Sequence, residues 1–98
     1  MEYDVIWSRR ARRDMKAIHD YIAEDNADAA DRVCDAIYKR VDVLRAVPRL
    51  AQRYECDVQG EVRQTVSGKY RLFFVIDDSN RRIEVLAVWH GARQELEL

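Results

Sequence analysis

Three strand-like segments follow one another in the second half of the chain, and they constrain its fold more than any other feature. The segments are residues 61–66, 70–76 and 83–89. Only residues 67–69 and residues 77–82 separate them, and both connections contain residues that favour hairpin turns, Ser67-Gly68 in the first and residues 77–80 in the second. Strands joined by such short turns pair in antiparallel order. The second half of the chain therefore predicts an antiparallel β-meander.

Two of these segments, residues 70–76 and 83–89, are apolar at both odd and even positions. Side chains of a strand alternate between the two faces of a sheet, so both faces of the meander must be covered. We expect two helices to cover one face. A loop or a partner chain is expected to cover part of the other face.

The first half of the chain predicts one short strand and two helices. Residues 5–7 form an apolar run, and Ser8 is a suitable N-cap for a helix over residues 9–24. Helical spacing of apolar residues resumes after Asn26 and ends before Pro48, because proline disfavours the helical conformation in the residue before it. The connection between the helices is very short, so they should pack as an antiparallel hairpin.

Together these elements predict an α+β fold, in which an antiparallel β-sheet carries an N-terminal helical hairpin on one face. The expected order of elements is β-α-α-β-β-β, with an irregular loop over residues 49–60. The 98 residues are enough for one modest hydrophobic core, so we expect a single domain over residues 1–98.

Composition argues against several classes of protein. The longest apolar runs have five residues, whereas a membrane span needs about 20. No apolar segment near the N-terminus resembles a signal peptide, so we expect a cytoplasmic protein without a membrane partner.

A net charge of −1 does not indicate a general electrostatic nucleic-acid binder. The two cysteines and two histidines lack the spacing of a metal site, and we expect neither a metal nor a cofactor.

Arg71 is the unusual residue of segment 70–76, because it is an arginine among apolar neighbours. Strand alternation places it on the same face as Phe73 and Val75. Such a side chain must contact an anion or reach solvent. The alternative is an ordinary ion pair, for example with Glu84.

Two further arginines, Arg63 and Arg93, are expected to lie close to Arg71 at one rim of the sheet. Three guanidinium groups there would suit a phosphate backbone or acidic side chains, since arginine binds both kinds of anion with two parallel hydrogen bonds.

Four more arginines, Arg9, Arg10, Arg12 and Arg13, crowd the first turns of the first helix. Cations oppose the helix dipole at that end, so a carboxylate or phosphate of a partner would stabilise them. The alternative is a solvated face that is neutralised in part by Asp14.

His90, at the end of the last strand, is a candidate general acid or base, because an unperturbed histidine titrates near neutral pH. The alternative is an ordinary histidine at the rim of a sheet. His19 lies beside the apolar stripe of the first helix and is expected to be structural.

These features, in this order, resemble the RelE/ParE superfamily of bacterial toxins. The residues that carry the resemblance are Ser8 after a short strand, Val47-Pro48 at the end of the helical hairpin, Gly68-x-Tyr70-Arg71, and His90-Gly91-Ala92-Arg93. The resemblance covers nearly the whole chain and is closer to ParE. It implies the toxin of a type II toxin–antitoxin (plasmid stabilisation) pair. It also implies a cognate antitoxin that wraps the toxin, covers the second face of the sheet, and alone contacts operator DNA.

Members of the superfamily act by two mechanisms. RelE-like members cut messenger RNA on the ribosome, using several basic residues to activate the ribose hydroxyl and stabilise phosphate charge. Arg71 and Arg93 match two of their arginines. Arg63 matches one of their lysines only if the Gly68-Lys69 turn is one residue longer, and Glu61 then takes the other lysine position. Without that shift the lysine positions hold Val62 and Gln64, and the C-terminal tyrosine of these enzymes has no counterpart.

ParE-like members inhibit DNA gyrase. The spacing from Arg63 to Tyr70-Arg71, the His90 to Arg93 ending and the near-neutral charge are closer to theirs. We therefore expect a non-enzymatic gyrase inhibitor with no catalytic residues assigned. The residues expected to bind the target or the antitoxin are Arg9, Arg10, Arg13, Arg63, Tyr70, Arg71, His90 and Arg93. One alternative is a RelE-type endoribonuclease with Arg63, Arg71, His90 and Arg93 as candidate catalytic residues. The other is a binding homologue that is not toxic.

Overall fold

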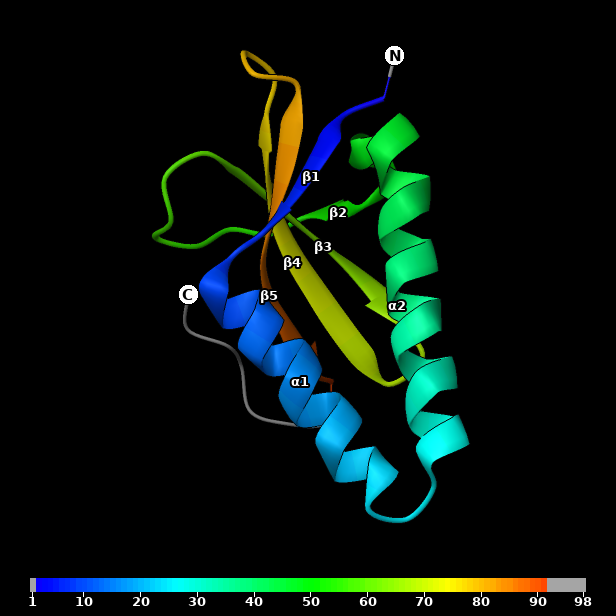
Figure 1. The fold of residues 1–98 in the computed structure, drawn as a ribbon. Helices are drawn as coiled ribbons and strands as arrows, with labels where there is room; N and C mark the ends of the chain where they lie inside the picture. Colours follow the sequence, from blue (N-terminus) through cyan, green and yellow to red (C-terminus); the bar gives the residue numbers. More distant parts are fainter. Residues whose placement is uncertain (1, 92–98) are drawn as a thin grey trace.

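The computed structural model describes residues 2–91, which form a five-stranded sheet and two long helices (Figure 1). The elements are β1 (Asp4–Trp7), α1 (Arg9–Ala23), α2 (Ala27–Ala46), the 3-10 turn η1 (Pro48–Leu50), β2 (Gln52–Arg53), β3 (Glu61–Ser67), β4 (Tyr70–Asp77) and β5 (Arg82–His90). The predicted α+β fold class is confirmed. Each helix and each strand expected from the sequence is present, with bounds that differ by at most a few residues.

The strands lie in the order β1-β5-β4-β3-β2, so the meander occupies the centre of the sheet. β3, β4 and β5 pair in antiparallel order, as predicted. The first strand, however, pairs in parallel with β5, which makes the sheet mixed. Residues 49–60 are less irregular than expected, because they contain η1 and the short strand β2 at the sheet edge. Two polar residues carry no alternation of apolar side chains, so the sequence gives no sign of β2.

The two helices form a hairpin that covers one face of the sheet, which we call the helix face (Figure 1). Its core joins Ile37 and Leu44 of α2 to Leu72 and Phe74 of β4, and all four are nearly inaccessible to solvent. Ser8 caps α1, as predicted, by accepting a hydrogen bond from the backbone N–H of Ala11. The core and the caps explain why this hairpin is helical throughout.

A β-bulge at Leu86 changes which residues of β5 face the helices. Phe73 lies opposite Ala87 and Phe74 lies opposite Val85, so Leu86 has no partner on β4. As a result Val85 and Val88 both point into the core on the helix face, while Ala87 points to the other side. The bulge accounts for the apolar residues at both odd and even positions of this strand.

The face of the sheet opposite the helices, which we call the open face, has a small cluster of its own. Phe73 and Ala87 are fully buried there, under Tyr54 and Trp89. Tyr54 comes from the segment between β2 and β3, and its ring packs against Phe73 edge-to-face, with centroids 4.9 Å apart. The expectation that a loop covers part of this face is confirmed. Within residues 2–91, none of the helices has the length and apolar character needed to cross a bilayer.

Candidate functional site

Arg71 lies on the open face and is held in one orientation by Gln64 and Phe73. Its Nε and Nη2 atoms both donate to Oε1 of Gln64, at 3.2 and 2.6 Å. The guanidinium carbon lies 5.1 Å from the ring centroid of Phe73, within the range of a cation–π contact. A neutral side chain and an aromatic ring therefore fix this arginine.

The charge of Arg71 is not compensated by any carboxylate within 4 Å among the residues that the structure describes. The ion pair with Glu84, expected as the alternative, is wrong. Arg71 lies opposite Trp89 on β5, whereas Glu84 lies opposite Val75, nearer the other end of the strand. The register of the two strands thus keeps Glu84 away and leaves Gln64 as the partner.

The neighbours of Arg71 across the sheet are apolar. Val66 lies opposite it on β3 and Trp89 on β5, and directly opposed residues point to the same face. The side chain of Val66 is 58% exposed, which is high for a valine in a sheet. Beyond Trp89, the guanidinium of Arg10 lies 5.8 Å from the indole ring. We call the row Val66, Arg71 and Trp89 the Arg71 platform.

Gly91 lets the chain pass beside this row. Its N–H donates to the carbonyl oxygen of Lys69 at 2.7 Å. A Cβ atom at this position would lie 3.1 Å from that oxygen and 3.7 Å from Cγ of Arg71. A Cβ at this position would therefore press against the backbone of the turn, and it would make an ordinary contact with the arginine stem.

Arg63 does not join Arg71. It lies opposite Phe74, so it points to the helix face, and it donates to Glu61 at 2.8 Å and to the carbonyl of Ala51 at 2.9 Å. The expectation that Arg63 and Arg71 share one rim is wrong. Arg63 lies opposite Phe74, and Phe74 is three residues from Arg71 along β4. Because three is an odd number, the alternation of side chains places Arg63 and Arg71 on opposite faces.

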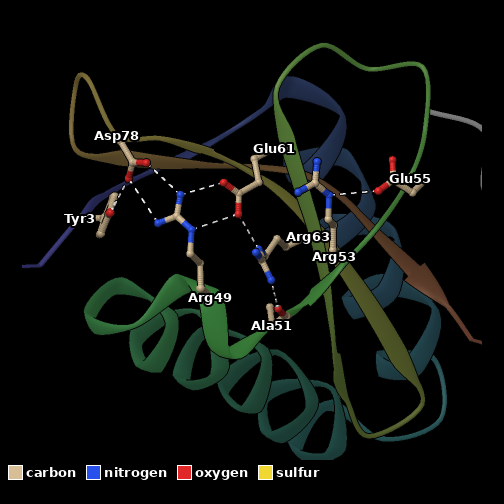
Figure 2. A network of polar contacts seen from close by, with 8 residues as sticks. All are labelled: Tyr3, Arg49, Ala51, Arg53, Glu55, Glu61, Arg63 and Asp78. Atoms are coloured by element: carbon tan, nitrogen blue, oxygen red, sulfur yellow. Dashed lines mark hydrogen bonds and ion pairs between the residues drawn. The ribbon is translucent and has the colours of Figure 1, made fainter.

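Arg63 belongs instead to a polar network centred on Arg49 (Figure 2). Arg49 of η1 contacts Glu61 at 2.7 Å and Asp78 at 2.8 Å. Asp78 also accepts a hydrogen bond of 2.6 Å from the hydroxyl of Tyr3. This network ties together the start of β1, the end of the helical hairpin, β3 and the turn between β4 and β5.

Electrostatics within this Arg49 network are mutual. The guanidinium of Arg49 lowers the pKa of both Glu61 and Asp78, with further contributions from Arg63 and from the Tyr3 hydroxyl respectively. The two carboxylates in turn raise the pKa of Arg49. The charges balance locally, which marks this cluster as a structural element and not as a free cationic site.

Tyr70 and His90 lie on the helix face, with ring centroids 5.4 Å apart in an edge-to-face arrangement. They line a groove of about 1040 Å³ between the two helices and the turn that joins β3 to β4. Most of its other lining residues are apolar, among them Ile18, Ile22, Val33 and Val88. His90 is therefore separated from Arg71 by the thickness of the sheet.

The arginines of α1 are partly neutralised, as the alternative interpretation predicted. Arg10 contacts Asp14 at 3.7 Å. Arg9, Arg12 and Arg13 are exposed and make no ion pair within residues 2–91. No group of three or more potential metal ligands gathers in that range.

The candidates from the sequence thus lie at separate places: Arg71 on the open face, Tyr70 and His90 in the groove, Arg63 in the Arg49 network, and three arginines on α1. Arg93 lies outside the described residues. Sequence reasoning missed Gln64 and Trp89 as neighbours of Arg71. Both could have been found from the register, since Gln64 lies two residues from the partner of Arg71 on the adjacent strand.

Comparison with known proteins identifies similar chains. The sequence model of one family, described as the ParE toxin of the type II toxin–antitoxin system parDE, matches residues 5–95. No curated protein sequence matches significantly.

Solved structures show the same fold at low sequence identity. A chain of the chromosomal ParDE toxin–antitoxin system from P. aeruginosa has a TM-score of 0.72 and 22% identity, over 91% of this chain and 96% of that one. A chain of the toxin–antitoxin complex RelBE2 from Mycobacterium tuberculosis has a TM-score of 0.71 and 24% identity, over 92% and 99%. A chain of the RelE–RelB complex from Pyrococcus horikoshii has a TM-score of 0.68 and 14% identity, over 95% and 99%.

Proposed function

The chain belongs to the ParE toxin family of type II toxin–antitoxin systems, and from this membership we propose that it inhibits DNA gyrase and is neutralised by a cognate antitoxin. The observation that carries the choice of gyrase is the separation of Arg63 and His90 from Arg71. A nuclease of the RelE type needs several basic groups around one phosphate, so that one activates the nucleophile and others stabilise developing charge. Here Arg63 and His90 lie on the helix face, while Arg71 lies on the open face.

The orientation of Arg71 favours the second candidate, a ribosome-dependent endoribonuclease of the RelE type. An oriented guanidinium with no carboxylate beside it in the described part of the chain is a suitable phosphate ligand. One such group binds a phosphate, but proton transfer to and from the ribose needs further groups. The nuclease candidate therefore ranks second.

The groove on the helix face supports the proposal of an antitoxin partner. It is large, mainly apolar and flanked by the exposed side chain of Tyr21. Apolar grooves between helices commonly accept an apolar segment of a partner. In this proposal the antitoxin contacts the toxin, and operator DNA is reached only through the antitoxin.

Two assays with the purified toxin test the choice of target. The proposal expects that the toxin inhibits DNA supercoiling by gyrase and that it leaves messenger RNA intact on translating ribosomes. Ribosome-dependent cleavage with unchanged supercoiling would reverse the ranking of the two candidates. Normal growth after strong induction without an antitoxin would instead indicate the non-toxic homologue.

Substitution of Arg71 locates the contact with the target. We expect Arg71→Ala to reduce the potency of the toxin by about tenfold or more, in line with the loss of a charge-assisted contact. Arg53→Ala is the matched control, because Arg53 is exposed and, among residues 2–91, forms its ion pair with the exposed Glu55. Equal potency of the two folded variants would remove Arg71 from the mechanism.

A further inference from the structure

We propose that residues 92–98 of the chain itself, which we call the acidic segment, bind Arg71 through the carboxylate of Glu95 or Glu97. The contact forms within one chain and occupies the guanidinium of Arg71 in the free protein. The contact does not depend on whether the toxin inhibits gyrase or cuts RNA.

The first argument is the place where the acidic segment begins. Gly91, the last residue that the structure describes, donates its N–H to the carbonyl oxygen of Lys69 at 2.7 Å. A Cβ atom built on Gly91 would lie 3.7 Å from Cγ and 3.8 Å from Cδ of Arg71. The acidic segment therefore leaves the sheet beside the stem of this arginine. The chain from Gly91 to Glu95 spans up to about 14 Å when extended, so its carboxylate can reach the end of the same side chain.

The second argument is the edge of the guanidinium that faces away from Gln64. Arg71 uses Nε and one N–H of Nη2 for a single acceptor, the Oε1 atom of Gln64. An arginine has five N–H donors in a planar fork. The two N–H groups of Nη1 and the second N–H of Nη2 form the other edge, which binds a carboxylate with two parallel hydrogen bonds.

Charge complementarity is the third argument. No carboxylate lies within 4 Å of the Arg71 guanidinium in the described part of the chain. The acidic segment carries two carboxylates, Glu95 and Glu97, and one cation, Arg93, so its net charge is −1. The first residues after Gly91 thus supply the type of group that the surroundings of Arg71 lack.

Attachment to Gly91 allows a weak ion pair to form. A pair between two exposed side chains is worth little by itself. The short connection, however, holds the carboxylates near Arg71 at an effective concentration of about the millimolar range or more. Gln64 and Phe73 already orient the guanidinium, so binding costs little further ordering of that side chain. The contact therefore forms in the free protein and is weak enough for a target to displace.

One consequence rests on the proposed function. If Arg71 contacts the target of the toxin, the acidic segment competes with the target for the same guanidinium. The chain then lowers its own potency, and removal of the two carboxylates should raise the potency by about two- to fivefold, as expected for a weak ion pair.

The test compares two variants of the whole chain, each with two carboxylates replaced by amides. In the first variant, Glu95→Gln and Glu97→Gln remove the carboxylates of the acidic segment. In the control, Asp25→Asn and Asp35→Asn make the same change of net charge at exposed positions of the helical hairpin, which covers the other face of the sheet. We expect the NMR signal of the Arg71 Nε–H to move in the first variant and to stay in place in the control. A high salt concentration should move the wild-type signal in the same direction as the first variant, because salt screens ion pairs.

The reciprocal measurement uses the carboxyl carbon signals of Glu95 and Glu97. Arg71→Gln should move at least one of these two signals. Arg53→Gln should move neither, because Arg53 is exposed and forms its ion pair with Glu55 among the described residues. Both substitutions leave a long polar side chain in place, so folding is expected in each.

Three outcomes would overturn the proposal. The first is an Arg71 signal that is unchanged in the first variant, and the second is an equal change in the first variant and in the control. The third is a wild-type Arg71 signal that moves toward that of the first variant when the protein is diluted tenfold, which would assign the contact to a second copy of the chain. A DNA supercoiling assay separates this proposal from the choice of gyrase. If the Arg71 signal moves as expected but the potency stays equal, the internal contact is supported and Arg71 is removed from target binding.

Discussion

Gln64 shows how one side chain decides the character of a surface. A glutamate at this position would bind Arg71 through two hydrogen bonds and cancel its charge. The amide orients the guanidinium equally well through a single oxygen, and the positive charge is retained. The positive charge on the open face therefore depends as much on Gln64 as on Arg71.

Gly91 is expected to control the position of Arg71. In Gly91→Ala, the new methyl group lies 3.1 Å from the Lys69 carbonyl oxygen, so the backbone of the turn must shift slightly, and it also contacts the stem of Arg71 at 3.7 Å. We expect a loss of about 1 kcal/mol in the free energy of unfolding. We also expect a changed NMR signal of the Arg71 Nε–H.

Gly68→Ala is the control for this prediction. Gly68 has a φ of +58°, but nothing lies within 4 Å of a Cβ built there. Alanine at this position costs about 1 kcal/mol in backbone strain, so the two variants should lose similar stability. An Arg71 signal that shifts equally in both variants would contradict the role of Gly91.

Arg71 also shows how far single residues could be predicted. Its unusual place in an apolar strand and its face were correct from alternation alone. The hydrogen-bond partner of Arg71 was not predicted correctly, because the choice between Gln64 and Glu84 depends on the register of three strands. Register follows from turn geometry and from the bulge at Leu86, and neither is apparent in the pattern of apolar residues.

At the scale of elements, α1 and its N-cap residue hydrogen-bond to the edge of β5 beyond the point where β1 ends. β1 pairs with β5 only as far as Val85. Beyond that point the hydroxyl of Ser8 donates to the carbonyl of Leu86, and the N–H of Val88 donates to Asp14 at 3.0 Å. Two polar side chains of the helix thus satisfy backbone groups that an edge strand would leave open.

This arrangement predicts the effect of removing Asp14. Asp14→Ala leaves the buried N–H of Val88 without an acceptor, which should cost about 1–3 kcal/mol of stability. Asp14→Asn keeps an acceptor and should cost less. Hydrogen exchange of the Val88 amide gives the direct measurement, because its protection should fall in Asp14→Ala.

Asp20→Ala serves as the comparison, since Asp20 forms an exposed pair with Lys16 on the same helix. Its stability should stay within about 0.5 kcal/mol of the wild type. Unchanged protection of Val88 in Asp14→Ala would show that this hydrogen bond does not hold the edge.

Elements as such were predictable, but not all of their pairings. The two helices follow from periodic apolar residues and from the Ser8 and Asn26 caps, which the structure confirms. The parallel pairing of β1 with β5 has no local signal, because it joins segments more than 70 residues apart. β2 was missed because a two-residue polar strand has no pattern at all.

On the scale of the whole molecule, the Arg49 network joins four segments that are distant in sequence (Figure 2). Folding lowers the pKa of Glu61 and Asp78 from their ordinary values of 4.5 and 3.8, chiefly through Arg49. Because the pKa of each carboxyl is lower in the folded than in the unfolded protein, the ionised carboxylates stabilise the fold fully at a pH above the two ordinary values. This stabilisation is lost as the pH falls below the ordinary values toward the pKa values of the folded protein.

The stability of Arg49→Met should therefore differ from the wild type in a pH-dependent manner. The wild type should be more stable near neutral pH, and the difference should shrink as the pH falls from about 5 to about 3. Urea unfolding across this range measures it. Arg53→Met, which breaks only the exposed pair with Glu55, should show little difference at any pH. A constant difference between Arg49→Met and the wild type would exclude the two carboxylates as its source.

The place of β5 between β1 and β4 sets the order of events during synthesis. The sheet cannot close before residues 82–90 have been made, because β5 is the strand that joins the N-terminal strand to the meander. The hydroxyl groups of Tyr3 and Ser8 likewise donate to acceptors that are made late, the carboxylate of Asp78 and the carbonyl of Leu86. Contacts so distant in sequence form late. A nascent chain thus carries no finished toxin surface until β5 has emerged.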